Sequence, residues 1–188
     1  LSRPGEYRYA DTNKDGVINA DDRVVLGSPF PDFTFGFGNE FNYKNFTLNF
    51  FIQGVQGSSI FNINRTESEN PISFRRNRLA ETYTDRWTPE NPTNAFPRPN
   101  SSYSTTNYLF QSTLGYVDGS FLKIRDVSLG YNLPKSVTNK IGVGRIRVYS
   151  TIQNYFTFSK LNDNDPERGG ALSFPLVKQM IFGINLDF

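Results

Sequence analysis

The chain has 188 residues and a formal net charge of +2, and it contains neither cysteine nor histidine, which excludes disulfides, Cys/His zinc sites and catalysis by Ser–His or Cys–His pairs. Its 18 Phe and 10 Tyr residues alternate with polar residues, and the mean hydropathy is only −0.50. No apolar run approaches the roughly 18 residues of a transmembrane helix, so a membrane protein of this composition would have to be a β-barrel, and the small charge gives no reason to expect nucleic acid as a partner.

The first predicted segment, residues 1–31, is a polar loop that contains a calcium-loop pattern. Side-chain oxygens fall at the first, third and fifth positions, and Gly16 at the sixth allows a sharp turn. Ile18 would anchor the loop to a core, and an aspartate stands at the last position, where a longer glutamate is usual. The predicted Ca²⁺ ligands are Asp11, Asn13, Asp15, the Val17 carbonyl and Asp22. A solvated turn without an ion is the alternative, because no helix pair flanks the loop.

Residues 33–53 predict a β-hairpin with one aromatic and one polar face. Tyr43 and Phe46 flank a two-residue turn at Lys44–Asn45 and therefore oppose each other, which joins the apolar sets of both strands in one surface. The first strand is long enough to cross a bilayer when tilted, and the polar face suits a wet lumen. The lumen-facing candidates here are Glu40, Asn42, Asn49 and Gln53. A soluble hairpin with a Phe-rich core face is the alternative.

Residues 54–118 predict a long loop rich in Asn, Ser, Thr, Pro and Arg, with a short helix over 73–86 that ends before Pro89. A loop of this length is unusual in a compact domain but typical of the extracellular side of outer-membrane barrels. Three arginines within 75–78 either bind an acidic group or form a solvated helix face. The aromatic residues that could stack on sugars, contact a lid or pack within the loop are Trp87, Tyr103, Tyr108 and Phe110.

Residues 119–158 predict two strands joined by a connection at 134–144. The parity of the apolar residues changes within the first strand, so we expect a β-bulge or a change of face near Arg125–Asp126. The second strand begins at Arg145 and reaches about Phe158. Its polar face adds the lumen-facing candidates Arg147, Tyr149 and Gln153. Residues 159–178 predict a second polar loop.

Residues 179–188 alternate with period two and place an apolar residue at every second position up to Phe188. An apolar-out, polar-in strand of about ten residues is typical of a transmembrane β-strand. A soluble domain rarely ends on its most hydrophobic strand, because chain termini fray unless they are tied down. The C-terminal strand of a soluble sandwich is the alternative.

The connections between the five predicted strands sort by length. If the C-terminus lies on the side of the short turns, all three long segments (1–31, 54–118 and 159–178) lie on the opposite side, as in bacterial outer-membrane barrels. Five strands cannot close a barrel, and bare edges in lipid would cost several kcal/mol per unsatisfied group. We therefore expect an all-β, antiparallel transmembrane β-barrel, of which these residues form the C-terminal part.

Several motifs occur in order along the chain: DTNKDGVI (11–18), GSPFPDF (27–33), FIQGVQG (51–57), RWTPENP (86–92), LGYNLP (129–134) and QNYFT (153–157). This ordered set resembles the C-terminal end of SusC/RagA-type TonB-dependent outer-membrane transporters of Bacteroidota. The resemblance implies a barrel of about 22 strands, with a plug and a TonB-contacting segment in upstream sequence. It also implies a SusD-like surface lipoprotein as partner and import of an oligosaccharide or a peptide across the outer membrane.

The end of the chain also resembles the signal that the barrel-assembly machinery reads. The positions that match its glycine and its two hydrophobic residues are Gly183, Leu186 and Phe188. Ile181 departs from the pattern, because a polar residue is usual there.

Two other classes of function compete with transport. A secreted, calcium-stabilised β-rich binding or adhesion module would need a closed core within 188 residues. An enzyme without His or Cys would depend on paired carboxylates, and the acidic residues lie mostly in loops without forming a convincing pair. We therefore expect no enzymatic activity and no cofactor other than Ca²⁺.

Overall fold

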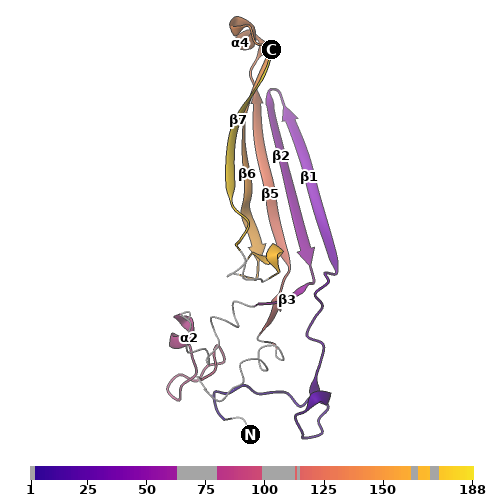
Figure 1. The fold of residues 1–188 in the computed structure, drawn as a ribbon, viewed down its shortest axis with the longest axis vertical. Coiled ribbons are helices and arrows are strands. Elements are labelled where there is room, and N and C mark those ends of the chain that lie inside the picture. Colours follow the sequence, from indigo (N-terminus) through magenta and orange to yellow (C-terminus); the bar gives the residue numbers. More distant parts are fainter. Residues whose placement is uncertain (1–2, 63–79, 99–112, 114, 162–164, 170–173) are drawn as a thin grey trace.

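The computed structural model describes residues 3–62, 80–98, 113, 115–161, 165–169 and 174–188. Five long strands form one antiparallel sheet in the order β1-β2-β5-β6-β7, so each long strand pairs with the next long strand of the sequence (Figure 1). The five predicted strands are confirmed with small changes at their ends. Their bounds are β1 Phe33–Tyr43, β2 Phe46–Gln56, β5 Phe121–Asn132, β6 Arg145–Ser159 and β7 Gln179–Asp187.

A second, two-stranded sheet pairs β3 (Ser59–Phe61) with β4 (Tyr116–Asp118). This small sheet could not be predicted from the sequence, because strands of three residues are too short to show a period-two pattern. It stands at the end of β2 and β5, inside the segment that was predicted to be a loop without strands.

The helices are short. They are η1 (Ala20–Asp22), α2 (Glu81–Thr84), α4 (Lys135–Thr138), η2 (Asn139–Ile141) and η3 (Pro166–Arg168). None of the helices in the described residues is long and apolar enough to cross a membrane. Of the helix predicted over 73–86, only α2 falls within the described residues, because 73–79 lie outside them.

Short turns lie at one end of the long sheet and long segments at the other, as predicted from the lengths of the connections. The Lys44–Asn45 turn, α4 and the C-terminus lie at one end, which we call the turn end (Figure 1). The N-terminal segment, β3 and α2 lie beyond the opposite end, which we call the loop end. At the turn, Tyr43 pairs directly with Phe46, which confirms the predicted hairpin register.

The ladders place most of the aromatic and aliphatic residues of the five long strands on one face, although others, such as Phe51, Tyr149 and Ile181, lie on the other. Phe37 pairs with Ile52, and Phe46 pairs with Tyr131, whose ring centroid lies 4.6 Å from that of Phe46. We call this the aromatic face, and its members include Phe33, Phe35, Phe37, Phe41, Phe46, Val127, Ile152, Met180, Phe182, Ile184 and Leu186. The residues between them form the polar face.

A β-bulge in β5 confirms the predicted irregularity. The β2–β5 register shifts between Phe51 and Ile52, and the β5–β6 register shifts between Ile124 and Asp126, which leaves Arg125 without a ladder partner. The extra residue restores the alternation, so Leu122 and Ile124 share the aromatic face with Val127.

The described residues contain almost no closed core. The buried hydrophobic side chains among them are Phe121, Ile146 and Leu161, whereas β1 is exposed along its whole length. A soluble module of this size would bury a contiguous set of apolar side chains. The described part of the chain therefore does not build the closed core that the soluble alternative requires.

A polar wall with a charge cluster at the loop end

All seven lumen-facing candidates lie on the polar face. Asn49 pairs with Glu40 on one side and with Ser128 on the other, and Ser128 pairs with Thr151 on β6. The set Glu40, Asn42, Asn49, Gln53, Arg147, Tyr149 and Gln153 therefore shares one face, opposite the aromatic face. Whether any of these side chains touches a transported molecule remains a prediction.

Hydrogen bonds connect the polar face from strand to strand. The Asn42 side-chain amide donates to Glu40 Oε1 (2.7 Å), and Thr47 Oγ1 donates to Asn42 Oδ1 (2.9 Å). On β5 and β6, Thr151 Oγ1 donates to Ser128 Oγ (2.8 Å). These hydrogen bonds give several side chains of the polar face a partner within the sheet.

Two glycines make room for large side chains on the polar face. A Cβ at Gly183 would lie 2.5 Å from Cε1 of the Tyr149 ring and closer still to its outer atoms, and a Cβ at Gly130 would lie 2.7 Å from Arg147 Nε. Tyr149 and Arg147 therefore lie flat across neighbouring strands. The close approach gives Gly183 a structural role in addition to its predicted place in the assembly signal.

The other two signal residues, Leu186 and Phe188, are 50% and 96% exposed. Near them, at the turn end, a small recess of about 200 Å³ is lined by Arg145, Arg147, Asn185 and Asp187. Arg147 Nε is buried there without a hydrogen-bond partner among the described residues.

A cluster of charged residues at the loop end is the most tightly bonded part of the polar face. Lys123 on β5 donates from Nζ to Asp165 Oδ1 (3.1 Å) and to Glu167 Oε2 (2.7 Å). Arg125 Nη1 lies 2.8 Å from Glu167 Oε2, and Gln53 Nε2 donates to Glu167 Oε1 (3.2 Å). Two cations and an amide from the strands thus converge on two carboxylates from the loop before β7.

Burial makes this cluster an ordered contact. The Lys123 side chain is only 1% exposed, while those of Asp165 and Glu167 are 9% and 24% exposed. Burial alone would raise the pKa of Asp165, but hydrogen bonds from the Leu176 amide and from Lys123 outweigh it and lower that pKa. Burial also opposes ionisation of Glu167, and the hydrogen bond and charge of Lys123 again lower the pKa. Both carboxylates are therefore ionised at neutral pH.

The calcium-loop residues form a turn that their own backbone stabilises. Asp11 accepts hydrogen bonds from the amides of Asp15 (3.2 Å) and Gly16 (2.8 Å), and Gly16 has the positive φ of 83° that the pattern requires. Asp22 accepts from the amides of Thr12 (2.7 Å) and Asn19 (2.8 Å), and the bond from Asn19 is the main cause of its lowered pKa.

Two features of this loop differ from the expected calcium site. Ile18, expected to anchor the loop in a core, is 53% exposed, because this part of the chain packs against no apolar layer in the described structure. Within the described ranges, no three or more acidic side chains come together in an arrangement that could hold a metal ion.

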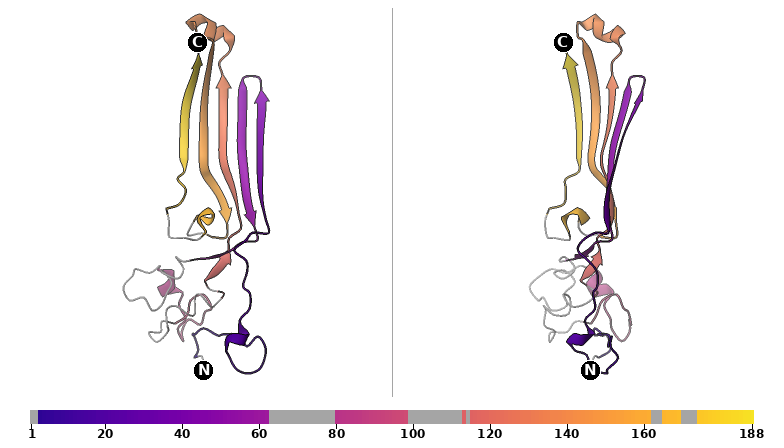
Figure 2. Two further views of the ribbon diagram at one scale, coloured as in Figure 1. Left: turned by 45° about the vertical axis from the view of Figure 1, so that its right-hand side comes forward. Right: turned by 90° about the vertical axis from the view of Figure 1, so that its right-hand side faces the viewer.

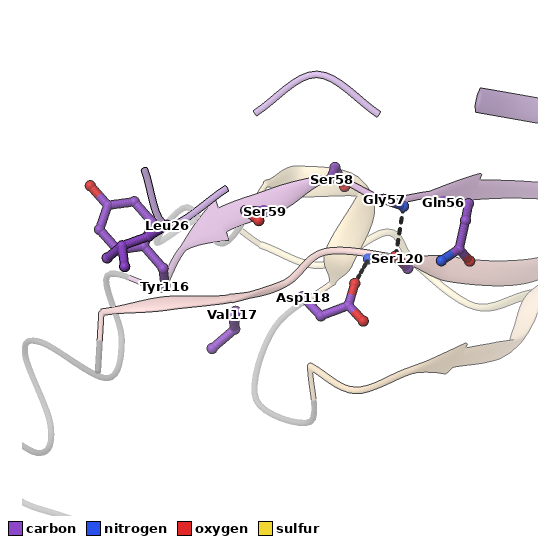
Figure 3. A pocket seen from close by; sticks show the side chains of 9 residues that line it. All are labelled: Leu26, Gln56, Gly57, Ser58, Ser59, Tyr116, Val117, Asp118 and Ser120. Carbon is purple, nitrogen blue, oxygen red and sulfur yellow. Dashed lines mark hydrogen bonds between the residues drawn. The ribbon is translucent and has the colours of Figure 1, made fainter. Parts of the chain in front are cut away.

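An open polar recess of about 310 Å³ lies beside the β3–β4 sheet at the loop end (Figure 3). The amide of Gly57 donates to Ser120 Oγ (3.0 Å), and the Ser120 amide donates to Asp118 Oδ1 (2.9 Å). Hydrogen bonds from Ser120 are the largest causes that lower the pKa of Asp118. The lining residues are Leu26, Gln56, Gly57, Ser58, Ser59, Tyr116, Val117, Asp118 and Ser120. The hydroxyls and the carboxylate suit hydrogen bonding to a hydroxyl-rich ligand.

Trp87, one of the candidate aromatic residues, packs within the loop region instead of presenting its face. A Cβ at Gly5 would lie 3.0 Å from Cγ of the indole, so the ring covers the N-terminal segment. Arg98 reinforces this contact through its ion pair with Glu6 (3.1 Å). The other candidates, Tyr103, Tyr108 and Phe110, and the arginines at 75–78 lie outside the described residues.

Sequence reasoning did not single out Lys123, Arg125, Asp165 or Glu167 as site residues. One signal was available, because Lys123 and Arg125 put two cations on the polar side of β5, next to the change of parity. A second was the Asp165-Pro166-Glu167 sequence, in which Asp165 caps η3 by accepting from the Glu167 amide.

Comparisons with known proteins give a consistent result. No family model matches the chain. It is 41% identical over 200 residues to "TonB-dependent receptor P26" of Formosa agariphila, covering 98% of this chain and 20% of that protein. It is 28% identical over 195 residues to "TonB-dependent receptor SusC" of Bacteroides thetaiotaomicron, covering 99% of this chain and 18% of that one.

Solved structures agree with these relatives. The RagAB peptide importer in its open-open state matches with a TM-score of 0.76 and 26% identity, over 92% of this chain and 19% of the other. The RagAB peptide transporter matches equally well, with 27% identity. The chain spans about one fifth of the length of the relatives it matches. The chain therefore belongs to the SusC/RagA-type TonB-dependent receptors of Bacteroidota and corresponds to a C-terminal portion of their β-barrel.

Proposed function

We propose that this chain forms part of the wall of a TonB-dependent transporter that imports a bulky nutrient, an oligosaccharide or a peptide, across the outer membrane. The observation that carries the proposal is the two-faced sheet. Phe33, Phe37 and Phe41 are each more than half exposed on one face, and hydrogen-bonded polar groups cover the other. Lipid would cover the aromatic face and water would fill the polar side, whereas in water alone the aromatic face would remain a large unpartnered apolar surface.

The proposal includes three partners. A SusD-like surface lipoprotein would cover the loop end, TonB would act through sequence upstream of this chain, and the barrel-assembly machinery would insert the barrel. The names of the relatives support the first two, since one is called SusC and all are called TonB-dependent receptors. These names are of receptors and importers, which supports a non-enzymatic role.

Native purification of the full-length receptor tests the proposal. We expect the receptor in the outer-membrane fraction, released only by detergent and slower in gel mobility after heating than before, as closed barrels are. We also expect a lipoprotein and a bound cargo to co-purify, and mass spectrometry of the cargo would separate peptide from oligosaccharide. Recovery of a water-soluble, monodisperse protein without detergent would refute the proposal.

We also propose that residues 11–22 bind Ca²⁺ through oxygens of Asp11, Asn13, Asp15, Val17 and Asp22. Their oxygen atoms suit a hard cation, and these residues stand at the sequence positions that supply ligands in calcium loops. Gly16 has the positive φ that the turn of such a loop requires. Ion binding would draw the three carboxylates closer together than they lie in this structure.

The assembly role of Gly183, Leu186 and Phe188 is likewise a proposal. Removal of Phe188 is expected to reduce the amount of receptor in the outer membrane several-fold, without altering the sheet, because Phe188 follows the last ladder pair, Arg145 with Asp187. Substitution of the exposed Ile141 by Ala, which is also at the turn end, is the control. Equal membrane levels of the two variants would contradict the assembly role.

A further inference from the structure

One part of the loop before β7 lies against the polar face instead of extending away from the sheet. It consists of residues 165–169 and 174–177, which we call the inner segment. Figure 2 shows η3 standing off one face of the sheet near the loop end. Its contacts with Gln53 and Lys123, which pair with each other on the polar face, identify that face.

The inner segment is attached to the sheet at two places. At its start, Asp165 and Glu167 bind Lys123 and Arg125 at 2.7–3.1 Å. At its end, Asn154 Nδ2 on β6 donates to the Val177 carbonyl (3.1 Å). The Leu176 amide donates to Asp165 Oδ2 (3.1 Å), which joins the two places to each other. A segment attached in this way cannot move from the wall without breaking several of these bonds.

Burial of Lys123 adds to this attachment. Its ammonium is almost inaccessible to water and takes its three contacts from the two carboxylates of the inner segment. Removing the segment would leave the cation without its counter-ions, and an uncompensated buried charge is strongly unfavourable. The charges also balance, because two cations of the wall face two carboxylates.

The residues that hold the inner segment all lie near the loop end of their strands. Gln53 lies near the end of β2, Lys123 near the start of β5, and its partner Thr157 near the end of β6. All three positions belong to the loop end. In a barrel with water on the polar side, the inner segment therefore occupies space at the mouth of the channel.

We propose that the inner segment narrows the channel at the loop end, and that Lys123 is the positioning residue that sets the largest cargo able to pass. This inference rests on the proposed transport function. Glu167 acts from the segment side of the same contact, while Arg125 and Gln53 orient its carboxylate.

The first measurement tests the attachment without using transport. Full-length receptor in isolated outer membranes is treated with an amine-acylating reagent, and labelling is quantified by mass spectrometry. Lys123 should be protected and Lys160, whose side chain is 81% exposed, should react. Glu167→Gln should raise Lys123 labelling relative to Lys160 by roughly tenfold. The substitution removes a charge-assisted hydrogen bond that holds the inner segment over Lys123, so the lysine becomes accessible more often.

The second measurement tests the effect on cargo size. Cells that carry the receptor with its native lipoprotein partner receive a length-graded peptide mixture or, separately, a length-graded dextrin mixture, and the imported species are sized. Lys123→Met and Glu167→Gln should both shift the upper length limit to longer species, since they break the same contact from opposite sides. Lys160→Met, which removes an exposed lysine at the same end, should leave the limit unchanged.

The outcomes separate the two proposals. Failure of the wild-type receptor to import either mixture would refute the transport function and this inference with it. Import by the wild type with the same length limit in both variants would refute the inference alone, as would free labelling of Lys123 in the wild type. If Lys123→Met fails to reach the membrane, Glu167→Gln carries the test, because it leaves every residue of the wall unchanged.

Discussion

The close approach of Gly183 on β7 to Tyr149 on β6 leads to a sharp prediction. A methyl group at Gly183 would lie 2.5 Å or less from two ring carbons and the hydroxyl oxygen of Tyr149, closer than real Cβ contacts come. The ring would have to retreat by about 1 Å to reach ordinary contact distance. Overpacking of this kind costs about 1–3 kcal/mol, and we expect about 1–2 kcal/mol for Gly183→Ala, because the clashing atoms are at the outer end of a side chain that can rotate.

A double-mutant cycle in the full-length receptor measures this effect. The urea midpoint of barrel unfolding in detergent is followed by gel mobility for the wild type, Gly183→Ala, Tyr149→Ala and the double variant. Gly183→Ala should lower the midpoint in the wild-type background and have little effect beside Tyr149→Ala. Asn185→Ala, on the same face of β7, changes a side chain without adding volume and is the control.

The cycle also separates two roles of the same glycine. If Gly183→Ala destabilises the barrel equally with and without the tyrosine ring, the steric explanation is wrong. If the variant reaches the outer membrane poorly while its purified barrel is as stable as the wild type, Gly183 acts in the assembly signal.

Three further predictions follow from the faces, the loop and the charge cluster. Val127→Arg, in mid-strand on the aromatic face, should destabilise the inserted barrel by about 2–4 kcal/mol in the same urea titration. Asn49→Arg, beside Glu40 on the polar face, should be nearly neutral. Equal effects of the two substitutions would contradict the assignment of faces. Calcium at a hundred times its dissociation constant should stabilise the 11–22 loop by about 2.7 kcal/mol. The measurement is the rate of proteolysis at Lys14, which should be slower in calcium than in chelator. Asp11→Asn should remove that difference. Because the pKa values of Asp165 and Glu167 are lowered in the folded chain, their stabilising contribution is present above their ordinary values of 3.8 and 4.5 and is lost as pH falls through the lowered values. Hydrogen exchange of the Leu176 amide, corrected for its intrinsic rate, should therefore accelerate only below about pH 4, and Asp165→Asn should weaken this pH dependence to the part that Glu167 contributes.

The long strands could be predicted from the sequence because their alternation is nearly uninterrupted. The pairing of Tyr43 with Phe46 followed from the two-residue turn, and the bulge at Arg125 followed from the change of parity in β5. Both depend only on local geometry and on the period of two that every strand shares.

The loop-end contacts could not be predicted in this way. Lys123 and Glu167 are 44 residues apart, and no periodic pattern connects a strand residue to a carboxylate in an irregular loop. The β3–β4 sheet was missed because its strands are too short. Ile18 was wrongly expected to be buried, because the calcium pattern suggested a core that the described part of the chain does not build.

In the long sheet, each long strand pairs with the next one along the chain. The loops between the strands can therefore change in evolution without changing how the strands pair. Each strand takes its register from the strand beside it, so residues inserted between Gln56 and Phe121 leave the β2–β5 ladder unchanged. Doubling the length of such a loop adds only about 0.6 kcal/mol of closure entropy. A lineage can therefore change the length and composition of the loop segments while it keeps the same ladder of paired strands, without having to solve the folding of the sheet again.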